Sequence, residues 1–359
     1  MRTSLTFAEP SMNATVEPVP VSPGGWTASV AHAGDAPLRE GVLQVPGELR
    51  LHHGGRLANV RLAWRLVGPA HAPVICALGG ISAGRRVCLT ENPRESWWSE
   101  VARADGALDT ARYRVLSFDY LGGSGETTGP KALEPFPSVS SYDQAELLLR
   151  LVNHLGVKAL RAIAGGSYGG MVALAFAERY PERVGQLIVL CAADRPNPLA
   201  VAWRSIERDI VRLGAEGGRP AQGLELARAL AMTTYRTGEE FAARFAAPPS
   251  LEDGRFVFPV ERYLKARGRD YAERHHAAAF LCLSESIDLH RVDAGRIFVP
   301  TTAVAIREDQ LVPLGDVRAM VARIRAAHLH EISSIYGHDG FLKESQQLRG
   351  VLAAALGSN

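Results

Sequence analysis

The sequence predicts an α/β fold with a mostly parallel central sheet flanked by helices, and with a helical lid inserted into it. Five short, nearly continuous apolar runs are typical of strands buried on both faces of a parallel sheet. Helix-period segments between several of these runs give the alternation that such sheets require. A mostly helical stretch, about residues 194–293, interrupts the alternation. With 359 residues and 47% hydrophobic composition, the chain can form one large core that carries an insertion.

The expected elements follow in chain order. From about residue 41, GVLQV, ELRLH and VRLAWRLV predict opening antiparallel strands. The buried runs are PVICAL at 73–78, YRVLSFD at 113–119, LRAIAG at 160–165, QLIVLCAA at 186–193 and TTAVAI at 301–306. Helices are predicted over 142–156 and 169–181, which end at Gly and Pro.

This pattern predicts three parts of the chain. Residues 1–25 are rich in Pro, Ser and small residues without periodicity, which favours a disordered N-terminal arm. The α/β core is expected over 26–193 and 294–359, and residues 194–293 form the lid segment.

Composition narrows the class of protein. The 40 Lys and Arg residues nearly balance 38 Asp and Glu, without a dense basic run, so a nucleic-acid partner is not expected. The cysteines at 76, 88, 191 and 282 form no CxxC pair, which predicts neither a disulfide framework nor a zinc or other metal site. No signal-peptide pattern or run of 18 apolar residues is present, and we expect a cytoplasmic protein without a membrane partner.

The segment GGSYG at 165–169 matches the pattern G-x-S-x-G. It follows the predicted buried strand LRAIA and opens the predicted helix MVALAFAERY, which is the context of a nucleophile elbow. In such a turn the serine backbone is strained, and side chains two residues away on either side would collide with the strand or the helix. Ser167 is therefore the candidate nucleophile, with a simple helix cap after a Gly-rich turn as the alternative.

A serine nucleophile needs a base, and a carboxylate to orient that base. His338 lies in the loop-like segment IYGHDGFLKE, just past a predicted strand, where a catalytic histidine is expected. His328 and His330 alternate within that strand, which favours a solvated position.

The candidate acid follows the buried run TTAVAI. Asp309 is preferred because it lies farther into the loop and has the shorter side chain, while Glu308 remains an alternative. The predicted oxyanion hole combines the Tyr168 amide with a backbone amide after the first central strand, from Leu78 or Gly79.

Several separated stretches then resemble one family, the α/β-hydrolase-fold homoserine O-acyltransferases, from about residue 42 to 356. They are FDYLGGSGETTGP, GGSYGGMVAL, RSIERDI, LARALAMTTYRTGEEFAARF, LCLSESIDLH and GHDGFLKE. ALGGISAGR, SYGGM, TYRTGEEF and EDQLVPL resemble most the homoserine O-succinyltransferase branch. Cys76 and Gly79 stand where the acetyl branch usually has His and Thr.

The resemblance implies transfer of a succinyl group from succinyl-CoA to the side-chain hydroxyl of L-homoserine, through a succinyl-serine intermediate, in methionine biosynthesis. The resemblance implies no cofactor, with succinyl-CoA as a co-substrate only. It also implies a homodimer. Alternatives are an L-serine O-succinyltransferase of cysteine biosynthesis, a homoserine O-acetyltransferase and, from another class, a serine esterase. An inactive binding protein of the same fold is disfavoured by the complete order of Ser, acid and His.

The family match assigns Ser167 as nucleophile, Asp309 as orienting acid and His338 as base. It also implies that Arg208 in the lid segment binds the acceptor carboxylate and that Asp339 binds the ammonium. Arg204, four residues before Arg208, lies on the same helical face. The hypothesis is that Arg204 pairs with the free carboxylate of the succinyl group, with Arg85 or Arg86 as substitutes.

Overall fold

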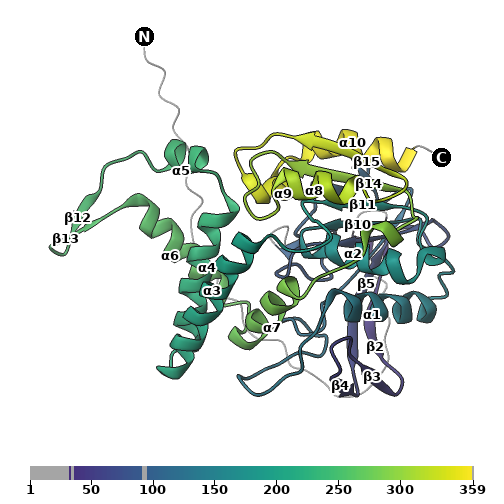
Figure 1. Cartoon of the computed structure of the whole chain (residues 1–359), viewed down its shortest axis with the longest axis horizontal. Coiled ribbons are helices and arrows are strands. Elements are labelled where there is room, and N and C mark those ends of the chain that lie inside the picture. The colour runs from purple at the N-terminus through teal and green to yellow at the C-terminus, as the bar shows by residue number, and fades with distance from the viewer. Residues whose placement is uncertain (1–31, 34–35, 91–94, 358–359) are drawn as a thin grey trace, which may run out of the picture.

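The computed structural model describes residues 32–33, 36–90 and 95–357. The N-terminal arm expected over residues 1–25 lies outside these described residues. Figure 1 shows a twisted sheet covered by helices on both faces, with a separate group of helices and a hairpin on one side.

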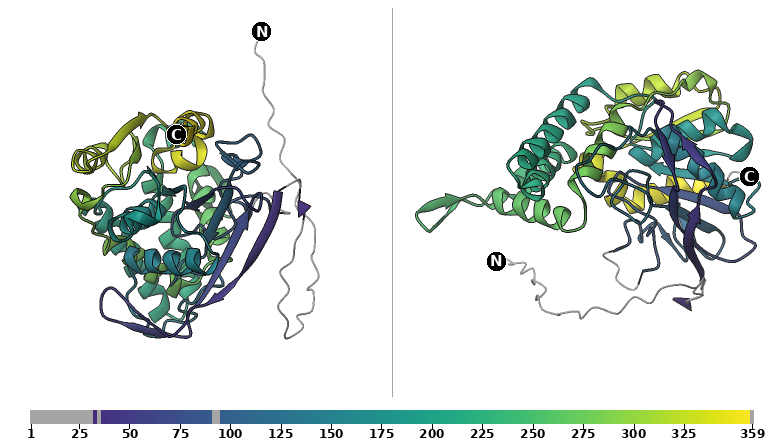
Figure 2. Two further views of the ribbon diagram at one scale, coloured as in Figure 1. Left: turned by 90° about the vertical axis from the view of Figure 1, so that its right-hand side faces the viewer. Right: turned by 90° about the horizontal axis from the view of Figure 1, so that it is seen from below.

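Nine strands of the described chain form one sheet, in the order β1-β2-β5-β9-β6-β10-β11-β14-β15. From β9 to β15 in that order the strands run parallel, while β1, β2 and β5 add an antiparallel edge (Figure 2). The strands are β1 His32–Ala33, β2 Ala36–Gln44, β5 Arg61–Val67, β6 Val74–Leu78, β9 Arg114–Phe118, β10 Ala162–Gly166, β11 Leu187–Leu190, β14 Thr301–Ile306 and β15 Ala327–Ile332. The predicted fold class is confirmed.

The inner strands are apolar throughout because both faces of the sheet are covered. On β10, Ile163 packs into a core shared with α1 (Ser141–His154) and α2 (Tyr168–Arg179). Its neighbours Ala162 and Ala164 pack into the opposite core, which includes α10 (Ser345–Gly357). Each side chain of the run therefore loses its contact with water, which explains the missing polar alternation.

The remaining elements of the α/β part are short. Two helices follow β14 and β15, and two small sheets lie outside the main one. They are α8 Leu314–Val321, α9 Gly340–Lys343, the antiparallel pair β3 Glu48–Arg50 and β4 Arg56–Ala58, and the parallel pair β7 Ala102–Arg103 and β8 Leu108–Asp109.

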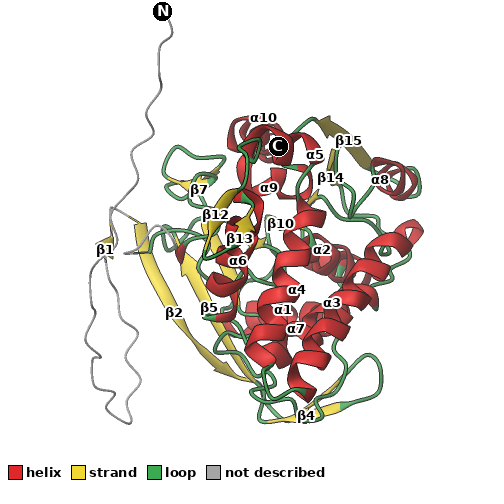
Figure 3. Ribbon diagram, turned by 90° about the vertical axis from the view of Figure 1, so that its left-hand side faces the viewer, coloured by secondary structure: helices red, strands yellow, loops and turns green. Residues whose placement is uncertain are grey.

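Residues 194–293 contain most of the elements outside the α/β layers, on the side of the molecule that Figure 3 presents. The helices are α3 Pro198–Glu216, α4 Pro220–Tyr235, α5 Gly238–Arg244, α6 Pro259–Ala272 and α7 Ala277–Asp288. Of these helices, α3, α4, α6 and α7 share a small core, in which Val211, Leu224 and Phe280 are buried. A hairpin of β12 (Ser250–Glu252) and β13 (Arg255–Val257), which the helical composition did not predict, projects between α5 and α6.

Candidate active site

The nucleophile turn joins β10 to α2 at Ser167. The backbone of Ser167 has φ 55° and ψ −121°, in the left-handed region that non-glycine residues rarely adopt. Its amide donates to the carbonyl of Leu190 at the end of β11, at 2.8 Å. This contact with the neighbouring strand holds the strained turn in place and presents the hydroxyl at the carboxyl edge of the sheet.

Two of the flanking glycines are required by close approach. A Cβ atom at Gly165 would overlap the carbonyl oxygen of Gly169, and a Cβ at Gly169 would overlap that of Leu78. Both obstacles are backbone atoms, which cannot rotate away as a side chain could. Strand, turn and helix therefore fit together only with glycine at these positions, as the sequence pattern predicts.

The structure brings His338 to Ser167. His338 follows β15 in a single turn before α9, and its Nε2 lies 2.9 Å from Ser167 Oγ. Its Nδ1 lies 2.7 Å from Asp309 Oδ2. Because the carboxylate can only accept, Nδ1–H is the donor, which leaves Nε2 free to accept the Ser167 proton. His328 and His330 are exposed on β15 and do not reach this site.

Both carboxylate oxygens of Asp309 accept hydrogen bonds, which fix the orientation of its side chain. Oδ2 accepts from His338, while Oδ1 accepts the amides of Leu311 and Val312 at 2.9 and 3.0 Å. The alternative acid, Glu308, turns away and accepts from Ser333 Oγ and the Ser334 amide. The backbone after β14 thus presents Asp309 to the imidazole.

The environment of His338 favours a moderately basic imidazole. Burial opposes protonation, but the charge of Asp309 and its hydrogen bond outweigh this effect, and the pKa of His338 is raised above its ordinary 6.5. The charge of Asp339 acts in the same direction, and that of Arg204 opposes it. A buried, oriented imidazole of raised pKa is suited to accept a proton from a hydroxyl near neutral pH.

Two hydrogen bonds and a strand pairing hold the backbone near the predicted oxyanion hole. Gly169 N–H and the Tyr120 hydroxyl both donate to the Gly79 carbonyl, at 2.9 and 2.7 Å, which places the end of β6 against the elbow. Leu78 pairs with Gly165 in the sheet. The Tyr168 side chain is buried, and its hydroxyl lies 2.6 Å from Ser286 Oγ on α7.

A cavity opens above Ser167 between the α/β core and the helices of residues 194–293. Its wall carries charged and aromatic side chains from several elements. The lining residues are Gly80, Ile81, Ser82, Ala83, Trp97, Ser167, Met171, Arg204, Glu207, Arg228, Thr234, Tyr235, Phe280, Ser284, Ile287, Leu311, His338, Asp339, Phe341 and Leu342.

The predicted arginines occupy different positions. Arg208 donates to Asp288 and Ser284 at 2.6 and 3.1 Å and does not line the cavity. Arg204 lines the cavity, and its Nε donates to the other oxygen of Asp288 at 2.7 Å. The Nη2 atom of Arg204 is buried without a hydrogen-bond partner. Asp288 thus forms an ion pair with each arginine, and of the two only Arg204 lines the cavity above Ser167.

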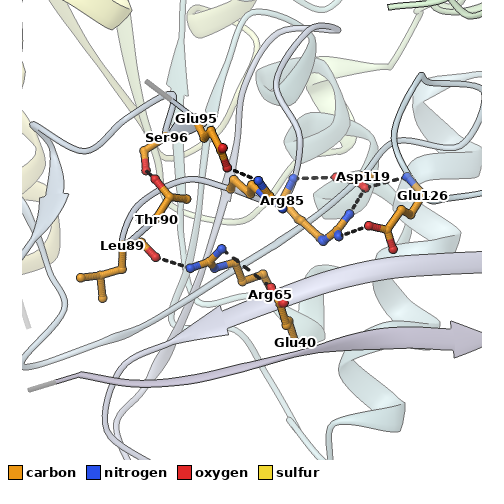
Figure 4. A network of polar contacts seen from close by, with 10 residues as sticks. Glu40, Arg65, Arg85, Leu89, Thr90, Glu95, Ser96, Asp119 and Glu126 are labelled. Atoms are coloured by element: carbon orange, nitrogen blue, oxygen red, sulfur yellow. Dashed lines mark hydrogen bonds and ion pairs between the residues drawn. The ribbon is translucent and has the colours of Figure 1, made fainter. Parts of the chain in front are cut away.

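The two arginines considered as substitutes for Arg204 form ion pairs outside the cavity, and Figure 4 shows the partners of Arg85. Arg85 is bound by Asp119 and Glu126, and its side chain is only 11% exposed. Arg86 pairs with Glu95. Neither arginine lines the cavity above Ser167.

Asp339 lines the cavity next to the base, and its Oδ2 accepts from Arg236 Nε at 2.8 Å. Two charged residues that sequence reasoning missed also line it, Glu207 on α3 and Arg228 on α4. The guanidinium of Arg228 lies over the ring of Tyr235, 5.0 Å from its centroid. The available signal was a charged residue between apolar residues four positions away on each side. Trp203 and Val211 flank Glu207 in this way, and Leu224 and Met232 flank Arg228.

The described ranges contain neither a metal-ligand cluster nor a helix suited to cross a membrane. No group of three or more His, Cys, Asp and Glu side chains there is arranged to hold a metal ion. Across the same residues, no helix has both the length and the apolar character that a bilayer crossing requires.

Comparisons with known proteins give the fold and the family of the chain. Residues 74–345 match the family model of the alpha/beta hydrolase fold. The chain is 38% identical to a homoserine O-succinyltransferase of Xanthomonas campestris pv. campestris, over 96% of this chain and 91% of the relative. It is 39% identical to a homoserine O-acetyltransferase of Thermus thermophilus, over 73% and 72% of the two chains.

A crystal structure of homoserine O-acetyltransferase from Bacillus anthracis has the same fold. It superimposes with a TM-score of 0.80 at 20% sequence identity, covering 89% of this chain and 97% of that one. With the family-model match and the extended similarity to the Xanthomonas relative, the assignment is complete: the chain belongs to the homoserine O-acyltransferase family of the α/β-hydrolase fold.

Proposed function

We propose that the protein transfers a succinyl group from succinyl-CoA to the side-chain hydroxyl of L-homoserine. The observation that carries the proposal is the continuous chain from Asp309 through His338 to Ser167, beneath a cavity with charged walls. The similarity to the Xanthomonas homoserine O-succinyltransferase, which extends over 96% of this chain, supports these substrates. The product carries an activated side chain of the kind that sulfur incorporation consumes in methionine biosynthesis.

The reaction has two steps, and in each of them His338 takes up a proton from the attacking hydroxyl and passes it to the leaving group. Ser167 Oγ attacks the thioester carbon while its proton passes to Nε2 of His338. The amides of Tyr168 and Leu78 stabilise the oxyanion. The C–S bond breaks, CoA leaves with the proton from His338, and a succinyl ester remains on Ser167.

In the second step the acceptor hydroxyl attacks the succinyl ester. His338 removes the hydroxyl proton, and the same amides stabilise the second oxyanion. The bond to Ser167 Oγ then breaks, and the proton returns to that oxygen as the product ester leaves. Asp309 holds the imidazole in one orientation and stabilises its protonated form in both steps.

For the acceptor, we propose Arg228 as the carboxylate contact in place of Arg208. Arg228 faces the cavity and forms no ion pair with a described residue, whereas Arg208 is held by Asp288 outside the lining. A planar guanidinium matches a carboxylate with two parallel hydrogen bonds. Asp339 remains the proposed contact of the ammonium group, because it lies on the cavity wall beside the base.

For the donor, we propose that Arg204 binds the free carboxylate of the succinyl group through its unpartnered Nη2. Arg204→Ala should lower the ratio of kcat/KM for succinyl-CoA over acetyl-CoA by about 10- to 100-fold, since a hydrogen bond to a charged group is lost. Arg208→Ala is the matched control, because it also removes one ion pair from Asp288, while Arg208 does not line the cavity. An unchanged donor ratio in Arg204→Ala would overturn this role.

The acidity of His338 predicts a pH profile. The imidazole must be neutral to accept a proton, and the pKa of His338 is raised above 6.5. The rate of CoA release should therefore fall as pH decreases through an apparent pKa above 6.5. The profile is measured as kcat/KM for the donor between about pH 5 and 9, a range that spans the titration of an imidazole. A limb centred below 6.5 would contradict the assigned base.

One experiment tests the proposed function against its alternatives. The pure protein is incubated with succinyl-CoA or acetyl-CoA, with L-homoserine or L-serine, and free thiol is followed. Thiol release that depends on the amino acid supports transfer, and the preferred pair identifies donor and acceptor. Release without an amino acid indicates an esterase, and no release indicates a binding protein. Initial rates should give the parallel reciprocal plots of a covalent intermediate.

We also propose a homodimer, which the exposed face of α3 supports. Leu199, Ile206 and Leu213 are spaced by seven residues, so they lie on one face, and they are 54%, 53% and 70% exposed. Such an apolar row is favourable when covered by a second copy. Sedimentation of the purified protein measures the oligomeric state directly.

A further inference from the structure

Glu207 is a buried carboxylate whose partner is not supplied by the described chain. Its side chain is on α3, the residue is 3% exposed, and it lines the cavity together with Ser167. The described residues give it neither a hydrogen bond nor an ion pair. An ionised carboxylate in such a place is costly unless a cation or hydrogen-bond donors approach it. The geometry therefore calls for a cationic group that enters the cavity from outside.

A second unpaired charge faces the same cavity. The guanidinium of Arg228 on α4 lies between two rings, 5.0 Å from the centroid of Tyr235 and 4.8 Å from that of Tyr271. Arg228 and Glu207 influence each other electrostatically but do not form an ion pair. A cation and an anion thus face one cavity with a gap between them, which is the arrangement that receives a zwitterion.

Asp339 differs from Glu207 in this respect. Its carboxylate already has a cation in the protein, because Arg236 donates to Oδ2 at 2.8 Å. The charge of Asp339 is therefore partly neutralised before any substrate binds. Of the two carboxylates on the wall, Glu207 has the greater need for an external partner.

The inference that follows rests on the proposed function. Among the proposed substrates, only the α-ammonium of the acceptor is cationic, since the succinyl group and CoA carry negative charges. We propose that Glu207 is a specificity-determining residue that binds the acceptor's ammonium group while Arg228 binds its carboxylate. An ammonium has three N–H donors, so it can donate to Glu207 and Asp339 at once. Acceptors that carry a hydroxyl and a carboxylate but no amine are then rejected.

The surroundings of Glu207 add a pH dependence to this role. Burial raises the pKa of Glu207 to about 7, with Arg204 and Arg228 acting in the opposite direction. The other titratable or charged groups that face it are Arg208 on α3, Tyr235 on α4, Tyr271 on α6 and Asp288 on α7. Below that pH the free carboxyl is protonated and attracts the ammonium less, so KM for the acceptor should rise as pH falls.

The test compares two acceptors in two variants. L-Homoserine and its deaminated analogue, 4-hydroxybutanoate, are assayed with the wild type, Glu207→Gln and the control Glu216→Gln. Glu216 is the last residue of the same helix and is exposed, so this control removes one carboxylate far from the lining. Glu207→Gln should lower the preference for homoserine over 4-hydroxybutanoate by about 10- to 100-fold. The effect should appear in KM for homoserine, whereas Glu216→Gln should keep the wild-type preference.

The outcomes separate the inference from the proposed function. If the wild type transfers an acyl group to homoserine but Glu207→Gln keeps the wild-type preference, the inference is wrong and the function stands. If the wild type transfers to no amino acid, the proposed function fails. The inference is then decided by calorimetry, with L-homoserine titrated into Ser167→Ala and into Ser167→Ala/Glu207→Gln. Binding to Ser167→Ala that weakens or disappears in the double variant supports the inference. Equal binding to both variants, or no binding to Ser167→Ala itself, overturns it.

Discussion

Ser167→Ala should abolish acyl transfer while leaving the fold intact. Without Oγ no covalent ester can form, and a loss in kcat of about 10⁴-fold or more is expected from removing a serine nucleophile. The fold should persist, because the strained φ of 55° at this position is set by the turn between β10 and α2 and not by the serine hydroxyl. The measurement is CoA release together with intact-protein mass spectrometry, which detects a succinyl adduct in the wild type under rapid quench.

The matched control for this variant is Ser284→Ala, which removes another serine hydroxyl from the same cavity wall. Ser284 accepts from Arg208 and lies on α7, away from the elbow. Ser284→Ala should still form the adduct on Ser167. An adduct of the same mass on the Ser167→Ala protein would show that another residue is the nucleophile.

Asp309→Asn should reduce kcat by about 10³- to 10⁴-fold, the effect seen when the orienting carboxylate of a triad becomes an amide. The side-chain oxygen of asparagine can still accept from the amides of Leu311 and Val312. Its NH₂ group then faces Nδ1 of His338 and favours the tautomer in which Nε2 carries the proton. That tautomer cannot accept a proton from Ser167. The rate of CoA release measures the loss.

Glu308→Gln provides the neighbouring control. Glu308 undergoes the same change of carboxylate to amide, but it binds Ser333 and Ser334 instead of the imidazole. This variant should retain wild-type activity. Asp309→Asn should also move the acid limb of the residual activity to lower pH, because the charge of Asp309 raises the pKa of His338. Comparable losses in both variants would show that the orienting acid is misassigned.

The α/β part of the fold could be predicted because its signals are local. The run TTAVAI coincides with β14, and YRVLSFD contains β9. The run at 186–193 extends beyond β11, because the chain turns at Cys191, which has φ 50°. The hairpin of β12 and β13 could not be predicted, since its short strands are almost entirely exposed and show no apolar alternation.

The candidate site was predictable where chain order and loop position limit the choice. Ser167, Asp309 and His338 each follow a strand at the carboxyl edge of the sheet, so parallel pairing brings them together. The charged wall was less predictable, because Arg204 and Arg208 share one helical face and both bind Asp288, and sequence spacing cannot show which of them also lines the cavity. Glu207 and Arg228 become neighbours only when α3 packs on α4, which no local pattern reports.

The bond between the Tyr168 hydroxyl and Ser286 links the elbow to α7. The amide of the same residue is the proposed oxyanion donor, so a shift of α7 should change the alignment of that amide. A displacement of α7 should therefore lower turnover, and it would also move Phe280, Ser284 and Ile287 on the cavity wall. The β12–β13 hairpin contributes no residue to that wall, which makes this end of the molecule the safer place to attach a label or a surface tether.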